Sequence, residues 1–288
     1  MQHGPAVRRR KLGAELRALR TSAGLTSGEA ARLAGWHQSK VSRIETGTSG
    51  VRPPDVRLLL DVYGVADPQL RELLLVLSGS GDGDGDGRHH WWHAYRGVLP
   101  PTYRDFISLE SQASAMRTLE TTVIPGLLQT PEYARAVTEA ALEGASQERL
   151  DTLVEVRLAR QDVLRATPPL ELSAVLDEAV LRREVGGPGV MARQLNRLAE
   201  AARLPQVRLQ VLPFGAGAHI GMTGPFVIFS FSRTSDLDVV VLDHLTSSLH
   251  LERKEDLRVY SEAFEALSIH ALSPEDSLDF IAGAAAGA

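Results

Sequence analysis

The stretch SGSGDGDGDG at residues 78–87 restricts the folding of this chain most, because it holds no apolar side chain to bury. Alternating Gly, Ser and Asp favour an extended, self-repelling tether over a helix or a strand. We therefore expect a flexible linker over residues 78–90, between an N-terminal domain at 8–77 and a C-terminal domain at 91–282. A chain of 288 residues gives both domains enough apolar content for a core.

The charge of the chain is divided between its two parts. Residues 1–57 hold 11 Lys and Arg against 4 Asp and Glu, whereas the remaining residues hold 20 against 32. A basic segment on an acidic body indicates a surface that binds a polyanion. Basic clusters are also common on ordinary solvated surfaces. The sequence motifs within this segment are therefore needed to distinguish a polyanion-binding surface from an ordinary one.

Composition also limits the compartment and the chemistry. The chain has no cysteine, which excludes disulfides and thiolate metal sites. No apolar run approaches the roughly 20 residues that span a bilayer. The basic cluster at residues 8–11 is not followed by the apolar segment of a secretory signal. We therefore expect a cytoplasmic protein that does not enter a membrane.

The N-terminal domain is expected to be an all-α module of five short helices. Leucines spaced i, i+4 and i+7 from Leu12 form one apolar stripe of the first helix. Thr26 and Glu29 form a capping-box pattern that begins the second. The third is expected over residues 37–46, and prolines begin a fourth and a fifth before residue 77.

The stretch LTSGEAARLAGWHQSKVSRIETG, residues 25–47, has the spacing of a helix-turn-helix. In that motif the second helix enters the major groove of double-stranded DNA and presents its N-terminal residues to base edges. The apolar residues expected to pack the two helices together are Ala30, Leu33, Val41 and Ile44. The residues expected to face base edges are Gln38, Ser39, Ser42 and Arg43. The residues expected to face phosphates are Thr26, Ser27 and Lys40.

Residues 12–77 resemble the phage-repressor-type (XRE) helix-turn-helix family, on the pattern L-x-x-L-R-x-x-x-G-L-T-x-x-E-A-A-x-x-A-G-x-x-x-S-x-V-S-R-I-E-x-G. The residues that this resemblance places against DNA are Gln38, Ser39 and Arg43 at bases and Ser27 at a phosphate. It also implies an ion pair between Arg20 and Glu45, which links the first helix to the end of the third. Such modules usually act as dimers on two half-sites, so we expect a homodimer.

The C-terminal domain mixes the periods of helix and strand. The expected strands are 117–124, 170–174, VRLQVLP, FVIFSF and DVVVL, with the last two central because they are apolar throughout. The expected helices are 131–143, 146–166, 190–203, 255–270 and 274–282, followed by an Ala/Gly tail that frays. This pattern predicts an α+β domain with a sheet of about four to six strands.

The C-terminal domain resembles that of actinomycete regulators of the WhiJ-like, antitoxin-like type. The runs that carry the resemblance are TVIPGLLQTPEYARA (122–136), EVRLARQDVL (155–164), VMARQLNRL (190–198) and LPFGAGAHIGMTGPF (212–226). Members are often encoded beside small partner proteins and are thought to sense a signal. The resemblance therefore implies regulation by a small-molecule ligand or a small protein partner.

The segment FGAGAHIGMTGPF, between two expected strands, is the candidate ligand-binding loop. Its candidate residues are Gly215, Gly217, His219, Gly221 and Gly224. Glycine permits positive φ and close backbone approach, so the loop can wrap a ligand, and the histidine can hydrogen-bond or titrate. A glycine-rich surface connection is an equally open alternative, because the spacing does not match G-x-G-x-x-G.

Other patterns argue against metal and cofactor chemistry. DGDGDG at 82–87 matches half of a calcium loop, but the twelfth position is His93 where a glutamate is required. The three histidines at 89, 90 and 93 have ligand spacing but adjoin the expected tether. Asp177 and Glu178 are expected to form a solvated turn. We expect no metal, no cofactor and no enzymatic activity.

Together these features predict a sequence-specific DNA-binding transcriptional regulator. Its C-terminal domain would sense a signal or organise the dimer. Two alternatives stay open: an antitoxin-like protein controlled by a small protein partner, and an enzyme tethered to DNA.

Overall fold

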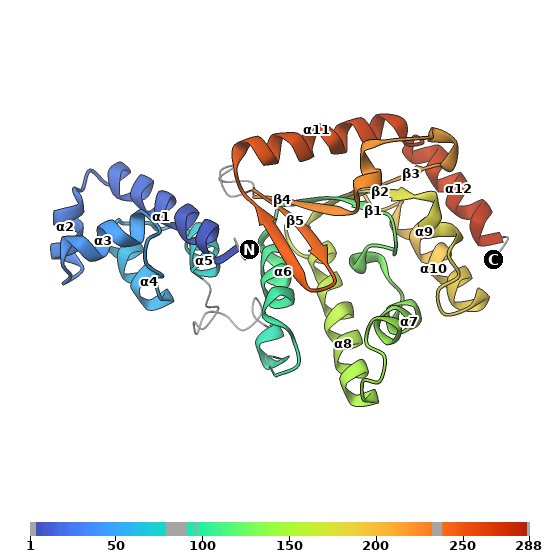
Figure 1. Ribbon diagram of the computed structural model, residues 1–288, viewed down its shortest axis with the longest axis horizontal. Helices are drawn as coiled ribbons and strands as arrows, with labels where there is room; N and C mark the ends of the chain where they lie inside the picture. Colours follow the sequence, from blue (N-terminus) through green and yellow to red (C-terminus); the bar gives the residue numbers. More distant parts are fainter. Residues whose placement is uncertain (1–3, 79–90, 96, 232–237, 287–288) are drawn as a thin grey trace. The chain divides into compact units, whose positions relative to one another are not determined.

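The computed structural model describes residues 4–78, 91–95, 97–231 and 238–286. It divides into two compact units, Met1–Ala94 and Tyr95–Ala288, and each is described by itself (Figure 1). Apart from Ser78, the expected linker lies outside the described residues, as do the calcium-loop pattern and two of the three histidines beside it.

The N-terminal unit is all-α, which confirms the predicted fold class of the first domain. Its helices are α1 (Gly4–Ser22), α2 (Ser27–Leu33), α3 (Gln38–Glu45), α4 (Pro53–Val62) and α5 (Pro68–Leu77), with a 3-10 turn η1 (Trp91–Tyr95) at the boundary of the units. The residues that centre its core are Leu12 and Leu16 of α1, Val41 and Ile44 of α3, Leu59 and Leu60 of α4, and Leu74 of α5.

The helix-turn-helix begins with the predicted capping box. The Glu29 amide donates to Thr26 Oγ1 at 3.2 Å, and the Thr26 amide donates to Glu29 Oε2 at 2.8 Å. Two amides that the first turn of α2 would leave without a helical partner are therefore satisfied.

One predicted core position of the motif is wrong. Leu33 is 50% exposed, whereas the smaller Ala30, Ala31 and Ala34 are buried. These alanines form the buried face of α2, which packs on α3. Leu33 then falls to the side of that face and meets solvent.

The C-terminal unit is built on one mixed sheet, which confirms the predicted α+β class. Its strands are β1 (Ala115–Glu120), β2 (Glu171–Asp177), β3 (Val207–Leu212), β4 (Phe226–Ser230), β5 (Val239–His244) and β6 (Ser247–Leu251). Their order is β3-β2-β1-β4-β5-β6. The pairs β1–β2 and β2–β3 are parallel, and β1–β4, β4–β5 and β5–β6 are antiparallel.

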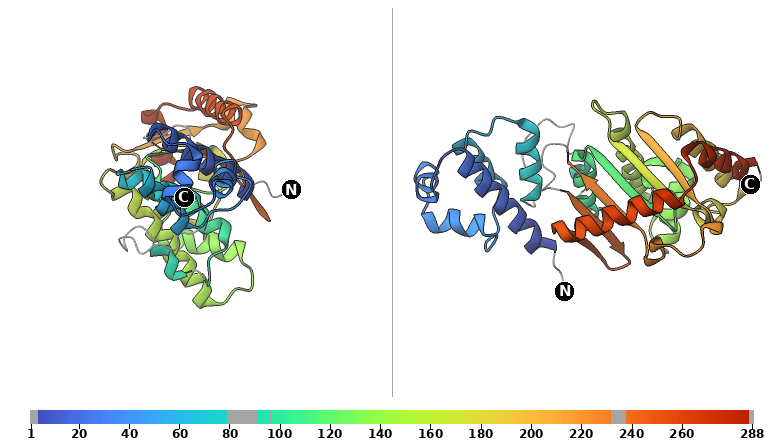
Figure 2. Two further views of the ribbon diagram at one scale, coloured as in Figure 1. Left: turned by 90° about the vertical axis from the view of Figure 1, so that its left-hand side faces the viewer. Right: turned by 90° about the horizontal axis from the view of Figure 1, so that it is seen from above.

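Helices cover both faces of this sheet. They are α6 (Pro101–Gln112), α7 (Pro131–Ala141), α8 (Gln147–Ala159), α9 (Glu178–Arg182), α10 (Pro188–Ala201), α11 (Lys254–His270) and α12 (Pro274–Ala286). Figures 1 and 2 show α11 lying across one face, with α6, α7 and α8 on the other. Helix α12 packs on α10 and beside β3.

Side chains from nearly every strand form the hydrophobic core under α11. Leu119 of β1 lies in register with Val175 of β2 and Phe226 of β4. These three side chains pack with Phe264 and Leu267 of α11. Strands β4 and β5 are both interior in the sheet, as expected. Residues 226–229 of β4 and 239–242 of β5 are apolar, whereas β5 ends in the exposed Asp243 and His244.

Several element bounds differ from the prediction. Strand β1 ends at Glu120 rather than at 124, because the chain bends there and enters a 3-10 turn η2 (Gly126–Leu128). The helix expected over 146–166 ends at Ala159 and continues as a 3-10 helix η3 (Arg160–Arg165), and α12 stays helical to Ala286 where fraying was expected. The unpredicted elements are α6, α9 and β6.

Candidate functional site

The predicted base-reading residues form one exposed surface of α3, called here the recognition face: Gln38, Ser39, Ser42 and Arg43. The opposite side of the helix is buried through Val41 and Ile44, which are 0% and 2% exposed. The helix packs on α2 with that buried side (Figure 1). The four polar side chains are therefore left for a partner.

The structure brings two predicted contact residues together across the turn. Gln38 Nε2 donates to Ser27 Oγ at 3.0 Å, so the starts of α2 and α3 are joined. The Gln38 amide keeps its carbonyl oxygen and one N–H, which is the pair of groups that recognises adenine. Arg43 Nε donates to the Ser39 carbonyl at 3.2 Å, which leaves the terminal nitrogens for a base or a phosphate.

Two of the residues predicted to contact phosphates already interact with neighbouring side chains in the N-terminal unit. Lys40 Nζ lies 3.3 Å from Asp55 Oδ1 and 3.5 Å from the centre of the Trp36 ring. The Thr26 hydroxyl donates to Glu29 Oε2 at 2.7 Å while it accepts from the Glu29 amide. A phosphate role for either residue stays a prediction, and each would have to exchange these contacts.

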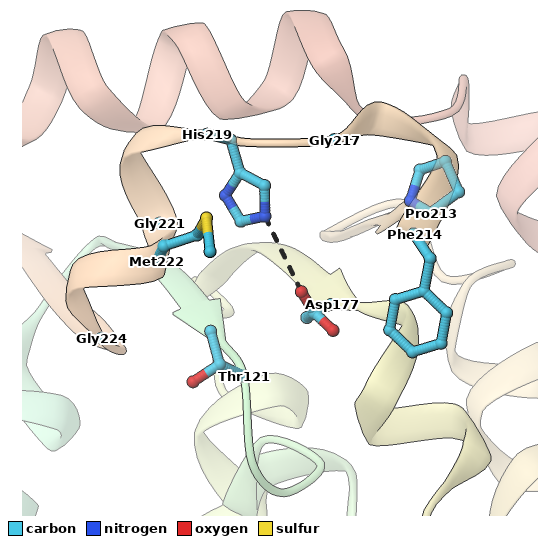
Figure 3. Close-up of a pocket in the computed structure, with 9 residues that line it drawn as sticks. All are labelled: Thr121, Asp177, Pro213, Phe214, Gly217, His219, Gly221, Met222 and Gly224. Atoms are coloured by element: carbon cyan, nitrogen blue, oxygen red, sulfur yellow. Dashed lines mark ion pairs between the residues drawn. The ribbon is translucent and has the colours of Figure 1, made fainter.

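The C-terminal unit holds a cavity of about 340 Å³ at the carboxyl ends of its three parallel strands. Thr121 follows β1, Asp177 ends β2, and Pro213 and Phe214 follow β3. The loop after β3 closes the other side with Gly217, His219, Gly221, Met222 and Gly224 (Figure 3). We call it the strand-end cavity. In parallel sheets this edge is where ligands commonly bind, because side chains from several strands meet there.

Three of the four predicted loop glycines have a structural reason to be glycine. Gly217 and Gly224 have φ of 71° and 123°, a region that disfavours other residues. A Cβ on Gly221 would lie 2.7 Å from Leu119 Cδ2. Gly215 has neither feature and does not line the cavity. A ligand-binding role for Gly215 therefore stays a prediction.

His219 points into the cavity toward Asp177 (Figure 3). Its Nε2 is 3.9 Å from Asp177 Oδ2, and the two side chains are 11% and 19% exposed. His219 Nδ1 is buried and has no hydrogen-bond partner among the described residues. Asp177 Oδ1 accepts from the Ala179 amide at 2.8 Å, so this carboxylate also caps α9.

The Asp177–Glu178 pair is not the solvated turn that was expected. Glu178 is 9% exposed. Its Oε2 accepts from the Phe214 amide at 2.9 Å, and its Oε1 accepts from Arg182 Nε at 3.1 Å. Glu178 therefore fixes the start of the loop after β3 to the end of β2, and Asp177 is left to face the cavity.

Comparison with known protein families matches two segments of the chain. Residues 11–74 match a helix-turn-helix domain. Residues 103–283 match a family described as a domain of unknown function, DUF5753. The chain belongs to the DUF5753 family. No curated protein and no solved structure matches it.

The helix-turn-helix match indicates a DNA-binding regulator, in agreement with the recognition face. The DUF5753 family description assigns no role to this domain. Any inference about its role in regulation therefore rests on the residues of the domain itself. In the part of the chain that the structure describes, no helix is long and apolar enough to cross a membrane. The same residues hold no group of three or more His, Asp or Glu placed to bind a metal ion.

Sequence reasoning did not select five residues of the cavity in the DUF5753 domain: Thr121, Asp177, Pro213, Phe214 and Met222. Thr121, Asp177 and Pro213 are separated by 36 or more residues and meet only because β1, β2 and β3 are parallel neighbours. The predicted strands gave a positional signal for Pro213 and Phe214, which end and follow VRLQVLP. They gave none for Thr121, which lies inside the predicted strand 117–124, or for Asp177, which lies beyond the predicted strand 170–174.

Proposed function

We propose that this chain is a sequence-specific, cytoplasmic transcriptional regulator of the XRE type that reads DNA with α3. The observation that carries the proposal is the recognition face. Four residues able to bind bases stand exposed on one side of a helix whose other side is buried. Gln38 is held at the entrance of that helix by Ser27, which prepares its amide for a base edge.

We further propose that the chain acts as a homodimer. One helix-turn-helix reads only a few base pairs, and two on half-sites about one helical turn apart give a specific site. The DUF5753 domains of the dimer would hold the two helix-turn-helix units at that spacing. Once one unit is bound to its half-site, tethering would make binding of the second unit intramolecular.

The strand-end cavity is the proposed signal site of the DUF5753 domain, with Gly217, His219, Gly221 and Gly224 of the predicted set around it. A ligand there would act by changing the geometry of the dimer. We propose binding without catalysis. His219 is the only histidine among the described residues that line the cavity; its Nδ1 is buried without a hydroxyl partner, and its Nε2 faces a carboxylate.

Mapping of bound DNA across the host genome, followed by titration of the full chain on a recovered site, tests the DNA-binding proposal. Gln38→Ala and Arg43→Ala should each weaken binding by about 1–3 kcal/mol and relax preference at one base pair. Arg149→Ala is the matched control, since it removes the same charge from an exposed position of α8. If Gln38→Ala and Arg43→Ala both keep the wild-type sequence preference, α3 does not read the DNA.

Light scattering of the full chain tests the dimer, together with titration on a site with two half-sites and on one with a single half-site. We expect two chains per particle and far tighter binding to the two-fold site. A monomer that binds both duplexes equally would contradict the dimer proposal while leaving the recognition face in place.

A second candidate function is favoured by the exposed apolar side chains beside the cavity. Phe214, Ile220 and Met222 are 60%, 53% and 74% exposed. An antitoxin-like protein would cover such a surface with a small protein partner. A photo-reactive residue at position 222 of the full chain, expressed in the host, distinguishes the two. Near-stoichiometric crosslinking to one small protein would favour the partner, and its absence would favour the ligand.

A further inference from the structure

The permanent charge in the lining of the strand-end cavity is negative. Of the described residues that line it, Asp177 is the only acid, and none is a lysine or an arginine. One oxygen of this carboxylate caps α9, whereas Oδ2 faces the cavity without a hydrogen bond from a described residue. A carboxylate oxygen accepts more than one hydrogen bond, so Oδ2 is an open acceptor aimed into the cavity.

His219 does not hydrogen-bond to this acceptor in the structure. Its Nε2 stands 3.9 Å from Oδ2, which is beyond hydrogen-bond length. The buried Nδ1 has no acceptor nearby, and a proton placed there would be a buried, unsatisfied donor. Nε2 is therefore the ring nitrogen that can donate a hydrogen bond into the cavity.

The side chains of Phe214 and Met222 form two apolar walls of the cavity. Phe214 and Met222 stand on opposite sides of the Asp177–His219 pair (Figure 3). Both are well exposed to solvent. Aromatic faces attract cations, and the thioether of methionine adapts to apolar groups of different shape. A volume near 340 Å³ lies at the lower end of the range for small-molecule sites.

We propose that the strand-end cavity binds a small organic cation, a protonated amine that carries an aromatic or aliphatic group. The ammonium group pairs with Asp177 Oδ2, and the apolar group lies between Phe214 and Met222. This inference rests on the proposed signal site and names the chemical class that fits it. An anion is disfavoured because no lining residue offers a permanent positive charge.

The test compares three probes of similar shape and different charge: 2-phenylethylamine, 2-phenylethanol and phenylacetate. The full chain has four methionines, and Met222 is one of them, whereas Met116 and Met191 are 3% and 1% exposed. Labelling the methionine methyl groups with ¹³C therefore gives an NMR signal inside the cavity. We expect the Met222 methyl signal to shift with the amine at about tenfold lower concentration than with the alcohol, and least with the carboxylate.

Asp177→Asn should lower the affinity for the amine about tenfold and leave the affinity for the alcohol unchanged. Asparagine retains an oxygen to cap α9, so the fold is preserved. Asp279→Asn on α12 is the control that removes the same charge outside the cavity. Phe214→Leu should also weaken the amine more than the alcohol, which gives a second, independent variant.

Equal affinity for amine and alcohol in the wild type, or no loss in Asp177→Asn, would overturn the organic-cation proposal. Binding of saturating 2-phenylethylamine should also change the affinity of the full chain for its mapped DNA site. If the amine binds as expected and the DNA affinity stays constant, the ligand class stands and the signal role of the cavity is overturned. The two failures are therefore distinguishable.

Discussion

The Arg20 guanidinium and the Glu45 carboxylate form a two-point ion pair that joins α1 to the end of α3. Nε donates to Oε1 at 2.7 Å and Nη2 to Oε2 at 2.9 Å, with the side chains 11% and 5% exposed. This hydrogen bonding raises the pKa of Arg20. The Tyr63 hydroxyl donates to Glu45 at 3.5 Å, and burial raises the pKa of Tyr63. The ion pair implied by the family resemblance is thus confirmed.

Loss of one partner of this pair should destabilise the N-terminal unit more than loss of both. Arg20→Met or Glu45→Gln leaves the remaining partner poorly solvated, which should cost about 3 kcal/mol. The double variant should recover about 1 kcal/mol of that loss. Urea unfolding followed by hydrogen exchange of α1 and α3 amides reports this unit alone. Arg17→Met, exposed on α1, is the control. A coupling energy of zero would show that the two side chains act independently.

Gly13 marks the closest approach of α1 to the end of α3. A Cβ there would lie 2.4 Å from the Ile44 carbonyl oxygen and 2.7 Å from that of Glu45. Alanine in a helix normally stabilises by about 1 kcal/mol over glycine. Here the backbone of α3 would have to move, so Gly13→Ala should destabilise by about 2 kcal/mol.

The control for this prediction is Gly28→Ala on α2, where the nearest heavy atom to an added Cβ is 4.0 Å away. Thermal unfolding should therefore shift downward for Gly13→Ala and stay level or rise for Gly28→Ala. Shifts of the same sign and size in both variants would mean that the contact between α1 and α3 yields easily.

A second buried pair fixes η3 to α6 in the C-terminal unit. Arg160 Nε and Nη2 donate to the two Glu110 oxygens at 2.7 Å each, and Nη1 donates to the Tyr103 hydroxyl at 2.7 Å. Burial alone would lower the pKa of Arg160, but Glu110 and Tyr103 raise it. Arg160 and Glu110 are 6% and 1% exposed.

Glu110→Gln should therefore cost about 3–5 kcal/mol of unfolding free energy, because it leaves the Arg160 charge buried without a counterion. Glu110→Gln combined with Arg160→Met should cost less than the single change. Urea unfolding of the C-terminal transition measures both, with Glu132→Gln, exposed on α7, as the control. A double variant less stable than Glu110→Gln would show that the arginine stabilises the unit without its partner.

The recognition face was predictable because it depends on neighbours in sequence. Helical spacing alone placed Val41 and Ile44 inward and Gln38 and Arg43 outward. Leu33 was placed wrongly because the rule ranks residues by hydrophobicity, whereas the small Ala30, Ala31 and Ala34 make up the buried face of α2. Periodicity predicts roughly which face is buried, but not which residues at the edge of that face meet solvent.

Only part of the cavity was predictable, because its residues come both from one loop and from strands that are distant in sequence. His219 and its glycines stand in one loop and could be read as a group. Asp177 and Thr121 join them through the parallel pairing of β1 with β2, and one sequence does not reveal which strands are neighbours. The burial of Glu178 was hidden in the same way, since its partner is the backbone of Phe214.

Glu120 is the last residue of β1 and carries a perturbed carboxyl group. Burial raises its pKa to about 7, against the lowering effects of a hydrogen bond from Thr118 and the nearby charges of Arg157 and Arg160. The side chain lies on the face of β1 opposite Leu119, away from the core under α11. Ionised Glu120 is therefore less stable in the folded chain than in the unfolded one.

The sign of the resulting pH dependence follows from that shift. Because the folded pKa is raised, the stabilising contribution is complete below the ordinary glutamate pKa, near 4.5, and is lost as the pH rises through about 7. The stability of the wild type relative to Glu120→Gln should fall by about 2 kcal/mol between pH 5 and pH 8. Glu171→Gln, at the exposed start of β2, serves as the control for titration elsewhere in the chain. Urea unfolding at both pH values gives the difference. A Glu120→Gln variant that tracks the wild type across this range would show that Glu120 is already solvated, because a group with the same pKa in both states contributes nothing to the slope.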